Sequence, residues 1–188
     1  MNLPIDRQEA LTLLEEKIQS ESLRKHSLAS EAIMQRLAGH FGEDEESWGI
    51  IGLLHDLDLE SIDDDMKRHG ETTAGWLSDK GFPEEALQAI RAHNGDILGV
   101  EPESRLDLAL TAAESMTGLV SACALIYPSK KVADVKVKSL RKRMKEKRFA
   151  ANVDRDRIRM HEKLGLEFDE FATLSLEGMV RAAEVLGL

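Results

Sequence analysis

Apolar residues recur every three or four positions along most of the chain, and strict alternation of apolar and polar residues is rare. A spacing of three to four matches one face of an amphipathic helix, whereas alternation would indicate a half-buried strand. The pattern therefore predicts an all-α protein. We expect a single compact helical bundle with additional helices at its C-terminal end.

Capping and breaking residues set the predicted limits of the helices. Asp6 and Glu9 have the spacing of a capping box, Gly39–His40 is interpreted as the stop of the second helix, and Asn94–Gly95 as the stop of the fifth. The predicted helices cover about residues 6–18, 22–37, 44–57, 65–81, 83–93, 102–127, 129–148, 154–164 and 168–186.

Composition limits the class of protein. The chain has 188 residues, of which 42% are hydrophobic. A chain of this length can bury roughly 70% of the surface that it exposes when unfolded, so it needs no disulfide or metal merely to fold. The single cysteine, Cys123, excludes an intrachain disulfide and a cysteine-based zinc cluster. A net charge of −10 disfavours nucleic acid and anionic membranes as partners.

The N-terminal residues lack the basic and then apolar layout of a signal peptide. The longest apolar stretch, near residues 119–127, is too short to span a bilayer. We therefore expect a cytoplasmic protein without a membrane partner. An acidic, helical chain of this size is compatible with a monomer and with a homodimer.

The most informative segment is an apolar run that ends in the adjacent His55 and Asp56. Neighbouring residues on a helix point about 100° apart, so both can bind one ion only near a helix end or with ligands from other helices. Burying them beside Ile50, Leu53 and Leu54 costs free energy unless they are paired or bind a metal. The dipeptide alone favours an ordinary helix end, with a histidine at the negative end of the dipole and an aspartate that begins a turn.

Two further side chains stand out by their surroundings. His26 has small residues as helix neighbours, which would let its ring point into a cleft, and the alternative is a surface histidine at the edge of a basic patch. Glu114 lies in the apolar stretch 106–126, where a buried carboxylate needs a metal ion, a histidine or an arginine to compensate it. Asp107 in the same stretch is interpreted as a residue that stabilises the helix start.

The other histidines fall into two groups. His69 and His93 lie close to predicted helix ends. His40 follows a predicted helix stop, and His161 lies in a charged run. We interpret His40 and His161 as solvated.

The order of these residues resembles the HD superfamily of metal-dependent phosphohydrolases. It consists of His26, the pair His55–Asp56, His69, His93 and an acid at position 114. Residues 52–56, 67–70 and 89–94 are similar to the flanks of the family's elements. The resemblance covers about residues 24–126 and implies an HD-domain-like helical bundle. It extends less specifically from Pro128 through the basic segment, which resembles a subgroup of uncharacterised HD hydrolases.

The resemblance also implies a set of metal ligands. The first divalent ion would be held by His26, His55, Asp56 and Glu114. His69 and His93 resemble the residues that hold a second ion, with Asp56 as the bridge. His55 and Asp56 are the candidate catalytic residues. This mixed imidazole and carboxylate set suits Fe, Mn, Ni, Co, Zn or Mg and does not choose among them.

The chain departs from the family pattern at two positions. The last ligand is usually aspartate, whereas this chain has Glu114, whose extra methylene would move the carboxylate or the ion. Many members follow the His-Asp pair with a Gly-Lys that helps to hold phosphate, whereas this chain has Leu57–Asp58. A cation that binds phosphate must therefore come from elsewhere.

The segment 130–150 has ten Lys or Arg and two acids, so it carries +8 while the rest of the chain carries −18. We interpret it first as a solvated helix that pairs with the acidic body. A second interpretation gives it the substrate-binding residues Lys130, Lys131, Lys136 and Lys138. Nucleic-acid binding is disfavoured because no aromatic platform interleaves the charges. The change in composition predicts an HD-like metal-binding domain over 1–128, with its core at about 22–127, and a C-terminal helical extension over 129–188 packed on it.

The resemblance implies a divalent-metal-dependent phosphohydrolase that acts on a small phosphorylated substrate through a metal-activated water. A nucleotide or dinucleotide is the expected substrate. The alternative is a non-catalytic HD-like domain that binds a nucleotide or a protein, and Glu114 in place of aspartate is the feature that favours it.

Overall fold

The computed structural model describes all 188 residues and contains helices, turns and loops but no strand, so the prediction of an all-α chain is confirmed. The helices are α1 (Arg7–Lys17), α2 (Glu21–Phe41), α3 (Glu45–Leu54), α4 (Glu71–Asp79), α5 (Glu84–His93), α6 (Gly95–Leu98), α7 (Arg105–Ile126), α8 (Val137–Met144), α9 (Arg155–Ile158), α10 (Phe168–Arg181) and α11 (Ala183–Leu186). Two short 3-10 helices cover Val132–Asp134 and Arg159–Glu162.

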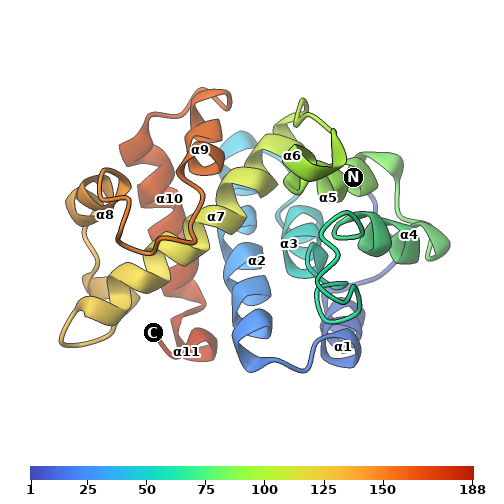
Figure 1. Cartoon of the computed structure of the whole chain (residues 1–188), viewed down its shortest axis with the longest axis horizontal. Coiled ribbons are helices and arrows are strands. Elements are labelled where there is room, and N and C mark those ends of the chain that lie inside the picture. Colours follow the sequence, from blue (N-terminus) through green and yellow to red (C-terminus); the bar gives the residue numbers. More distant parts are fainter.

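The helices α2 and α7 form the centre of the molecule, with α3, α4 and α5 on one side and α8, α10 and α11 on the other (Figure 1). α2 packs against α3, α7 and α10, and α7 also contacts α5 and α9. One connected core contains buried apolar side chains from both ends of the chain, among them Leu14 and Phe171. The C-terminal helices therefore pack on the same core as the histidine-bearing helices.

Polar side chains cap the starts of several helices, among them α1, α2, α3 and α7. Asp6 and Glu9 form the predicted capping box at α1. Ser104 and Asp107 form a second capping box at α7, in which each side chain accepts a hydrogen bond from the other residue's backbone N–H. Asp107 therefore has the helix-start role expected of it.

The predicted stop of the second helix at Gly39–His40 is wrong. α2 continues to Phe41 and ends at Gly42, whose φ of +72° is the left-handed conformation that favours glycine. Leu37 and Ala38 are buried, and Phe41 packs on the core. Because the apolar face continues past Gly39, packing sustains the helix for another turn.

The predicted continuous helix over 129–148 is also wrong, because only Val137–Met144 is α-helical. Val132 and Val135 are buried in the core before this helix, and this draws the chain away from a straight path. After α8 the chain turns, and the Arg155 guanidinium donates to backbone carbonyls that include those of Ala150 and Val153. Tertiary contacts decide the shape of this basic segment.

The predicted and observed limits of other helices differ by smaller amounts. The third helix stops at Leu54 and continues as turns, and the fourth begins only at Glu71. A single helical turn, α6, follows directly after the predicted stop at Asn94. The predicted helices over 154–164 and 168–186 are each divided in two, the second at Ala182.

α7 has the length and the apolar composition of a membrane span, which the prediction from the stretch 119–127 did not foresee. However, 67% of its most apolar part is buried inside the protein. Its neighbours there include α2, α5 and α9. α7 is therefore the apolar core helix of this fold.

Candidate metal centre

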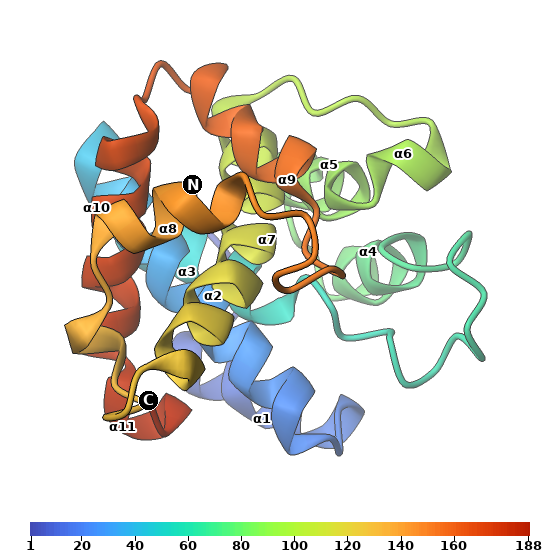
Figure 2. The same cartoon turned by 60° about the vertical axis from the view of Figure 1, so that its left-hand side comes forward.

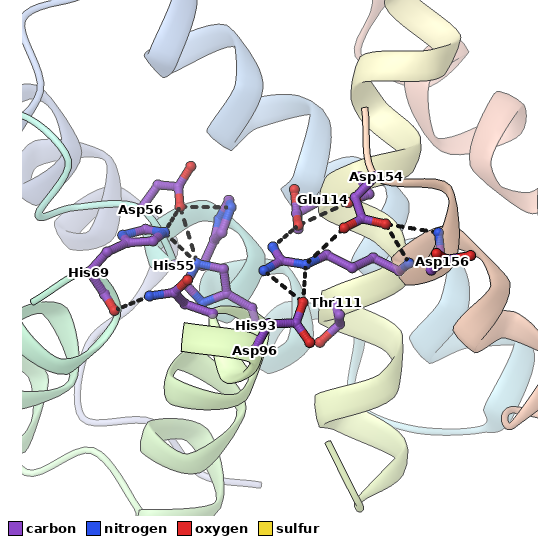
Figure 3. A network of polar contacts seen from close by, with 12 residues as sticks. His55, Asp56, His69, His93, Asp96, Thr111, Glu114, Asp154 and Asp156 are labelled. Carbon is purple, nitrogen blue, oxygen red and sulfur yellow. Dashed lines mark hydrogen bonds and ion pairs between the residues drawn. The ribbon is translucent and has the colours of Figure 1, made fainter. Parts of the chain in front are cut away.

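The structure brings together five of the predicted ligands, from α2, the end of α3, the turn before α4 and the end of α5. They are His26, His55, Asp56, His69 and His93. Figure 3 labels four of them, His55, Asp56, His69 and His93. The ligand atoms form two groups of three, within 4.8 Å of one another in each group, and Asp56 belongs to both. We refer to these five residues as the metal centre.

A close approach of two helices positions the first half of this centre. A Cβ atom at Gly52 would lie 3.0 Å from the carbonyl oxygen of Ser30, so a larger residue would force α3 away from α2. His55 follows less than one turn after Gly52. The contact therefore brings His55 to face His26, and their Nε2 atoms lie 3.2 Å apart.

A tight turn at Gly70 positions the second half. Gly70 has a φ of +81°, which favours glycine, and a Cβ atom there would lie 2.9 Å from the carbonyl oxygen of Ile90. This turn therefore packs directly on α5. His69, immediately before it, meets His93 with an Nε2–Nε2 distance of 2.9 Å.

The Asp56 carboxylate lies between the two pairs of rings. Its Oδ1 is 3.2 Å from the Nε2 of His55 and 3.4 Å from those of His69 and His93. Its Oδ2 is 3.4 Å from the Nε2 of His26. Each histidine therefore presents Nε2, and not Nδ1, to the shared carboxylate.

Backbone carbonyls orient two of the rings. The Nδ1–H of His55 donates to the carbonyl oxygen of Gly52 at 2.8 Å, and that of His93 donates to the carbonyl oxygen of Ile90. A carbonyl only accepts, so the proton of each neutral ring lies on Nδ1. Each Nε2 then carries the lone pair that a metal needs.

Asp58 orients His69. Its Oδ1 accepts the Nδ1–H of His69 at 2.7 Å, and its Oδ2 accepts the backbone N–H of Gly70 at 2.7 Å and that of Thr73 at 3.1 Å. Burial disfavours the charged form of Asp58, but these hydrogen bonds outweigh burial and lower its pKa. A fully buried carboxylate thus holds the second half of the metal centre.

His26 has a weaker support. Its Nδ1–H donates to the hydroxyl of Thr117 at 2.9 Å, and that hydroxyl donates in turn to the carbonyl oxygen of Glu114 at 2.6 Å. One hydroxyl on α7 therefore sets the tautomer and direction of the His26 ring.

This donor set fits a metal ion. Four Nε2 lone pairs and a carboxylate point at one another at 2.9–3.4 Å, and such groups repel unless a cation separates them. Two nitrogen or oxygen ligands at about 2.0–2.2 Å from one ion are themselves roughly 3 Å apart. The spacing and the chemistry of both groups therefore suit a divalent ion.

The pKa values of Asp56 and of the histidines around it also indicate that this site favours a positive charge. Burial disfavours a proton on His55, but the adjacent Asp56 carboxylate outweighs it and raises the pKa of His55 to about 9. Burial works against the charge of Asp56 too, yet His55 and the other rings hold the pKa of Asp56 well below its usual range. Burial lowers the pKa of His26 and of His93. A positive charge is therefore favoured beside Asp56, and a proton and a metal ion compete to supply it.

Glu114 does not join either group of ligand atoms. Its Oε1 lies 3.1 Å from Nη1 of Arg157, which also pairs with Asp96 at 3.4 Å (Figure 3). Ser115 donates to the same Oε1, and no hydrogen bond engages Oε2. The partly buried carboxylate of Glu114 is thus compensated by an arginine, which was one of the expected solutions. Ligation of a metal by Glu114 stays a prediction.

The remaining predicted residues lie away from the centre. The lysines predicted to bind substrate are exposed, and their role stays a prediction; they are Lys130, Lys131, Lys136 and Lys138. His40 is exposed, as expected. His161 was expected to be solvated but is buried, where its Nδ1–H donates to the carbonyl oxygen of Leu166.

Sequence reasoning missed Asp58, Thr117 and Arg157. Asp58 was noted only as a departure from the family pattern, although a second aspartate two residues after Asp56 is a visible signal. Thr117 lies three residues after Glu114, on the same side of α7, and this spacing could have marked it. Arg157 had no signal, because nothing local places it beside Glu114.

Comparison with known proteins agrees with the sequence resemblance. The HD domain family matches residues 23–118, about half of the chain. Ribonuclease Y of Oleidesulfovibrio alaskensis is 30% identical to this chain over 100 residues. The matched segment covers 53% of this chain but only 18% of that relative. No solved structure matches the chain.

Proposed function

This chain belongs to the HD domain family, and we propose that it is a divalent-metal-dependent phosphohydrolase that acts on a phosphate ester such as a nucleotide or dinucleotide. The convergence of four imidazole Nε2 atoms on the Asp56 carboxylate carries the proposal. The similar ribonuclease supports chemistry at phosphorus by its name. We do not propose RNA as the substrate of this chain, because the matched segment covers only 18% of the ribonuclease.

His26, His55 and Asp56 would hold the first ion, and Asp56, His69 and His93 the second. Glu114 would add a ligand to the first ion through Oε2. Divalent ions held in this way supply an acidic water molecule and positive charge beside the phosphoryl oxygens. His55 and Asp56 are the residues that we propose as catalytic.

The chain's own residues would contribute orientation and proton control. Asp58 and Thr117 keep the Nδ1 protons of His69 and His26 in place, so their Nε2 atoms stay available as ligands. The buried side chains of His55 and His93 keep bulk water from the deep face of the centre. Substrate and solvent would exchange at His26, whose side chain is the most exposed of the five.

The test combines metal analysis with assays. Purified protein is expected to contain up to two transition-metal ions per chain and to hydrolyse nucleotides, nucleotide diesters or p-nitrophenyl phosphate with Mn, Fe, Ni, Co or Mg. His55→Ala should lose both properties, whereas His40→Gln, an exposed histidine outside the centre, should keep them. Protein without a bound divalent ion and without hydrolysis, in which His55→Ala changes nothing, would refute the proposal.

One observation favours a second function, a non-catalytic domain that binds a nucleotide or a protein. Glu114 is held by Arg157, and this pair competes with ligation of the first ion. In that case nucleotides would raise the melting temperature of the protein without being hydrolysed under any metal condition. Turnover that depends on Asp56 would exclude this alternative.

A further inference from the structure

The metal centre is open to solvent at one of its members. The His26 side chain is 25% exposed, whereas those of Asp56 and His69 are 9% and 7% exposed and those of His55 and His93 are nearly covered. A molecule that reaches the centre must therefore approach over His26.

A groove adjoins this opening. It lies between α2, the C-terminal half of α7 and α11, and its volume is about 430 Å³. We refer to it as the His26 groove, and its lining includes Lys25, His26, Thr117, Ser121, Leu125 and Leu186. Pockets that enclose small ligands have volumes of roughly 300–1,000 Å³, so the groove has room for one small organic molecule.

The charge of the groove is unusual for this protein. The chain carries −10 overall, yet no aspartate or glutamate side chain lines the groove, although Leu188 with its main-chain carboxyl group does. Lys25 is its only lysine or arginine. The Lys25 ammonium lies 2.8 Å from Glu21, but Glu21 is 82% exposed, and such exposed pairs contribute little and exchange readily. Lys25 can therefore exchange this exposed partner for an anion bound beside His26.

The far end of the groove is apolar and incompletely covered. Leu125, at the end of α7, is 56% exposed, and its neighbour Ile126 is 52% exposed. Val185 on α11 is 54% exposed, and α11 lies beside the end of α7 in both views (Figures 1 and 2). Of these three exposed side chains only Leu125 lines the groove itself, where it offers an apolar surface to a bound organic group.

We infer that the His26 groove binds a phosphate monoester of mononucleotide size. The phosphoryl group would lie between the metal centre and the Lys25 ammonium, and the organic group would pack against Leu125. The inference rests on the proposed function for the reaction at phosphorus, but the binding itself can be measured without it. A groove of this volume in an acidic protein favours a single nucleotide over an RNA strand, whose many phosphates the rest of the surface would repel.

The experiment measures binding and not turnover. The probe is the methylene phosphonate analogue of adenosine monophosphate, which cannot be hydrolysed at the bond concerned, and it is titrated calorimetrically into the full chain with and without Mn²⁺. Adenosine and inorganic phosphate alone should each bind at least tenfold more weakly than the analogue. Lys25→Gln should raise the Kd about tenfold, and Lys25→Arg should largely restore it.

A second variant tests the groove itself. Ser121→Phe should raise the Kd at least tenfold by filling the groove, and circular dichroism checks that it is folded. The control is Lys80→Gln, an exposed lysine at the end of α4 and outside the groove, which should leave the Kd unchanged.

The inference is overturned if Lys25→Gln and Ser121→Phe both bind like the wild-type chain. It is also overturned if the analogue does not bind while a twelve-nucleotide RNA does. If the analogue binds through Lys25 but no phosphate ester is hydrolysed with any metal, the groove assignment stands and the proposed function fails.

Discussion

The two halves of the metal centre contain the same kinds of ligand atoms but differ in support and access. The half that contains His69 and His93 is buried, and Asp58 holds it with a charged acceptor. A small cavity of about 20 Å³, enough for a single water molecule, borders it at His93. In the other half, one threonine hydroxyl holds the His26 ring, and this half adjoins a groove of about 430 Å³.

This difference suggests that the two halves of the metal centre have different roles. The Asp58 carboxylate accepts three hydrogen bonds, which stabilise its charged form and fix the orientation of His69. A single hydroxyl leaves more freedom, which suits the side where ligands enter and leave. We therefore expect the buried half to bind its ion more tightly, and the open half to exchange its ion and meet the substrate.

The largest effect is expected from Asp56, the one residue that both halves share. Asp56→Asn should weaken the binding of both ions more than about 100-fold, because losing a ligand costs more than losing its support, which alone costs 10–100-fold. Hydrolysis should fall with metal content. Elemental analysis and calorimetric titration with Mn²⁺ measure the loss, and Asp79→Asn, an exposed aspartate, is the control. Retention of one ion at full affinity would show that the halves are independent.

Asp58→Ala should act on one half only. We expect the second ion to bind about 10–100-fold more weakly while the first is unaffected. The free energy of unfolding should also fall by about 1–3 kcal/mol, since buried donors lose their acceptor. Because the pKa of Asp58 is lowered, its stabilisation is present above its usual pKa and is lost as the pH falls below it.

Urea denaturation of the wild-type chain and Asp58→Ala at neutral and acidic pH checks this effect. The difference between the two proteins should shrink toward acidic pH. An equal loss of both ions would contradict the division between the halves.

Thr117→Val is the matched change in the open half. It removes the acceptor for the Nδ1–H of His26 while keeping the shape of the side chain. The first ion should bind about tenfold more weakly and the second should be unchanged, the reverse of Asp58→Ala. Competition titrations with two metals of different affinity separate the sites. A loss confined to the second ion would invert our assignment.

The smallest effect concerns Glu114 and Arg157, at the border of the open half. If Glu114 ligates the first ion, Glu114→Gln should weaken that ion by about tenfold or less, whereas Arg157→Gln should strengthen it by releasing the carboxylate. The affinity for Mn²⁺ distinguishes these results. If both variants bind Mn²⁺ like the wild-type chain, Glu114 is only the partner of Arg157.

The sequence by itself determined the helical class, the capping box at α1, the role of Asp107 at the start of α7 and the order of the histidines. These features depend on residues a few positions apart, where the helical period fixes their relation. The tertiary structure alone decided which atoms meet. His26 and Thr117 are 91 residues apart in the chain, and Glu114 and Arg157 are 43 apart.

Contacts at such separations depend on how the helices pack, which no local pattern encodes. The sequence could not show that Glu114 faces Arg157, that Asp58 holds His69, or that the groove beside His26 is lined by Lys25 and not by the lysines of the segment 130–150. The basic segment shows the same limit, because its helix breaks where Val132 and Val135 enter the core. The sequence supplies the residue types that can bind a metal ion or a phosphate, and helix packing decides which of them share a site.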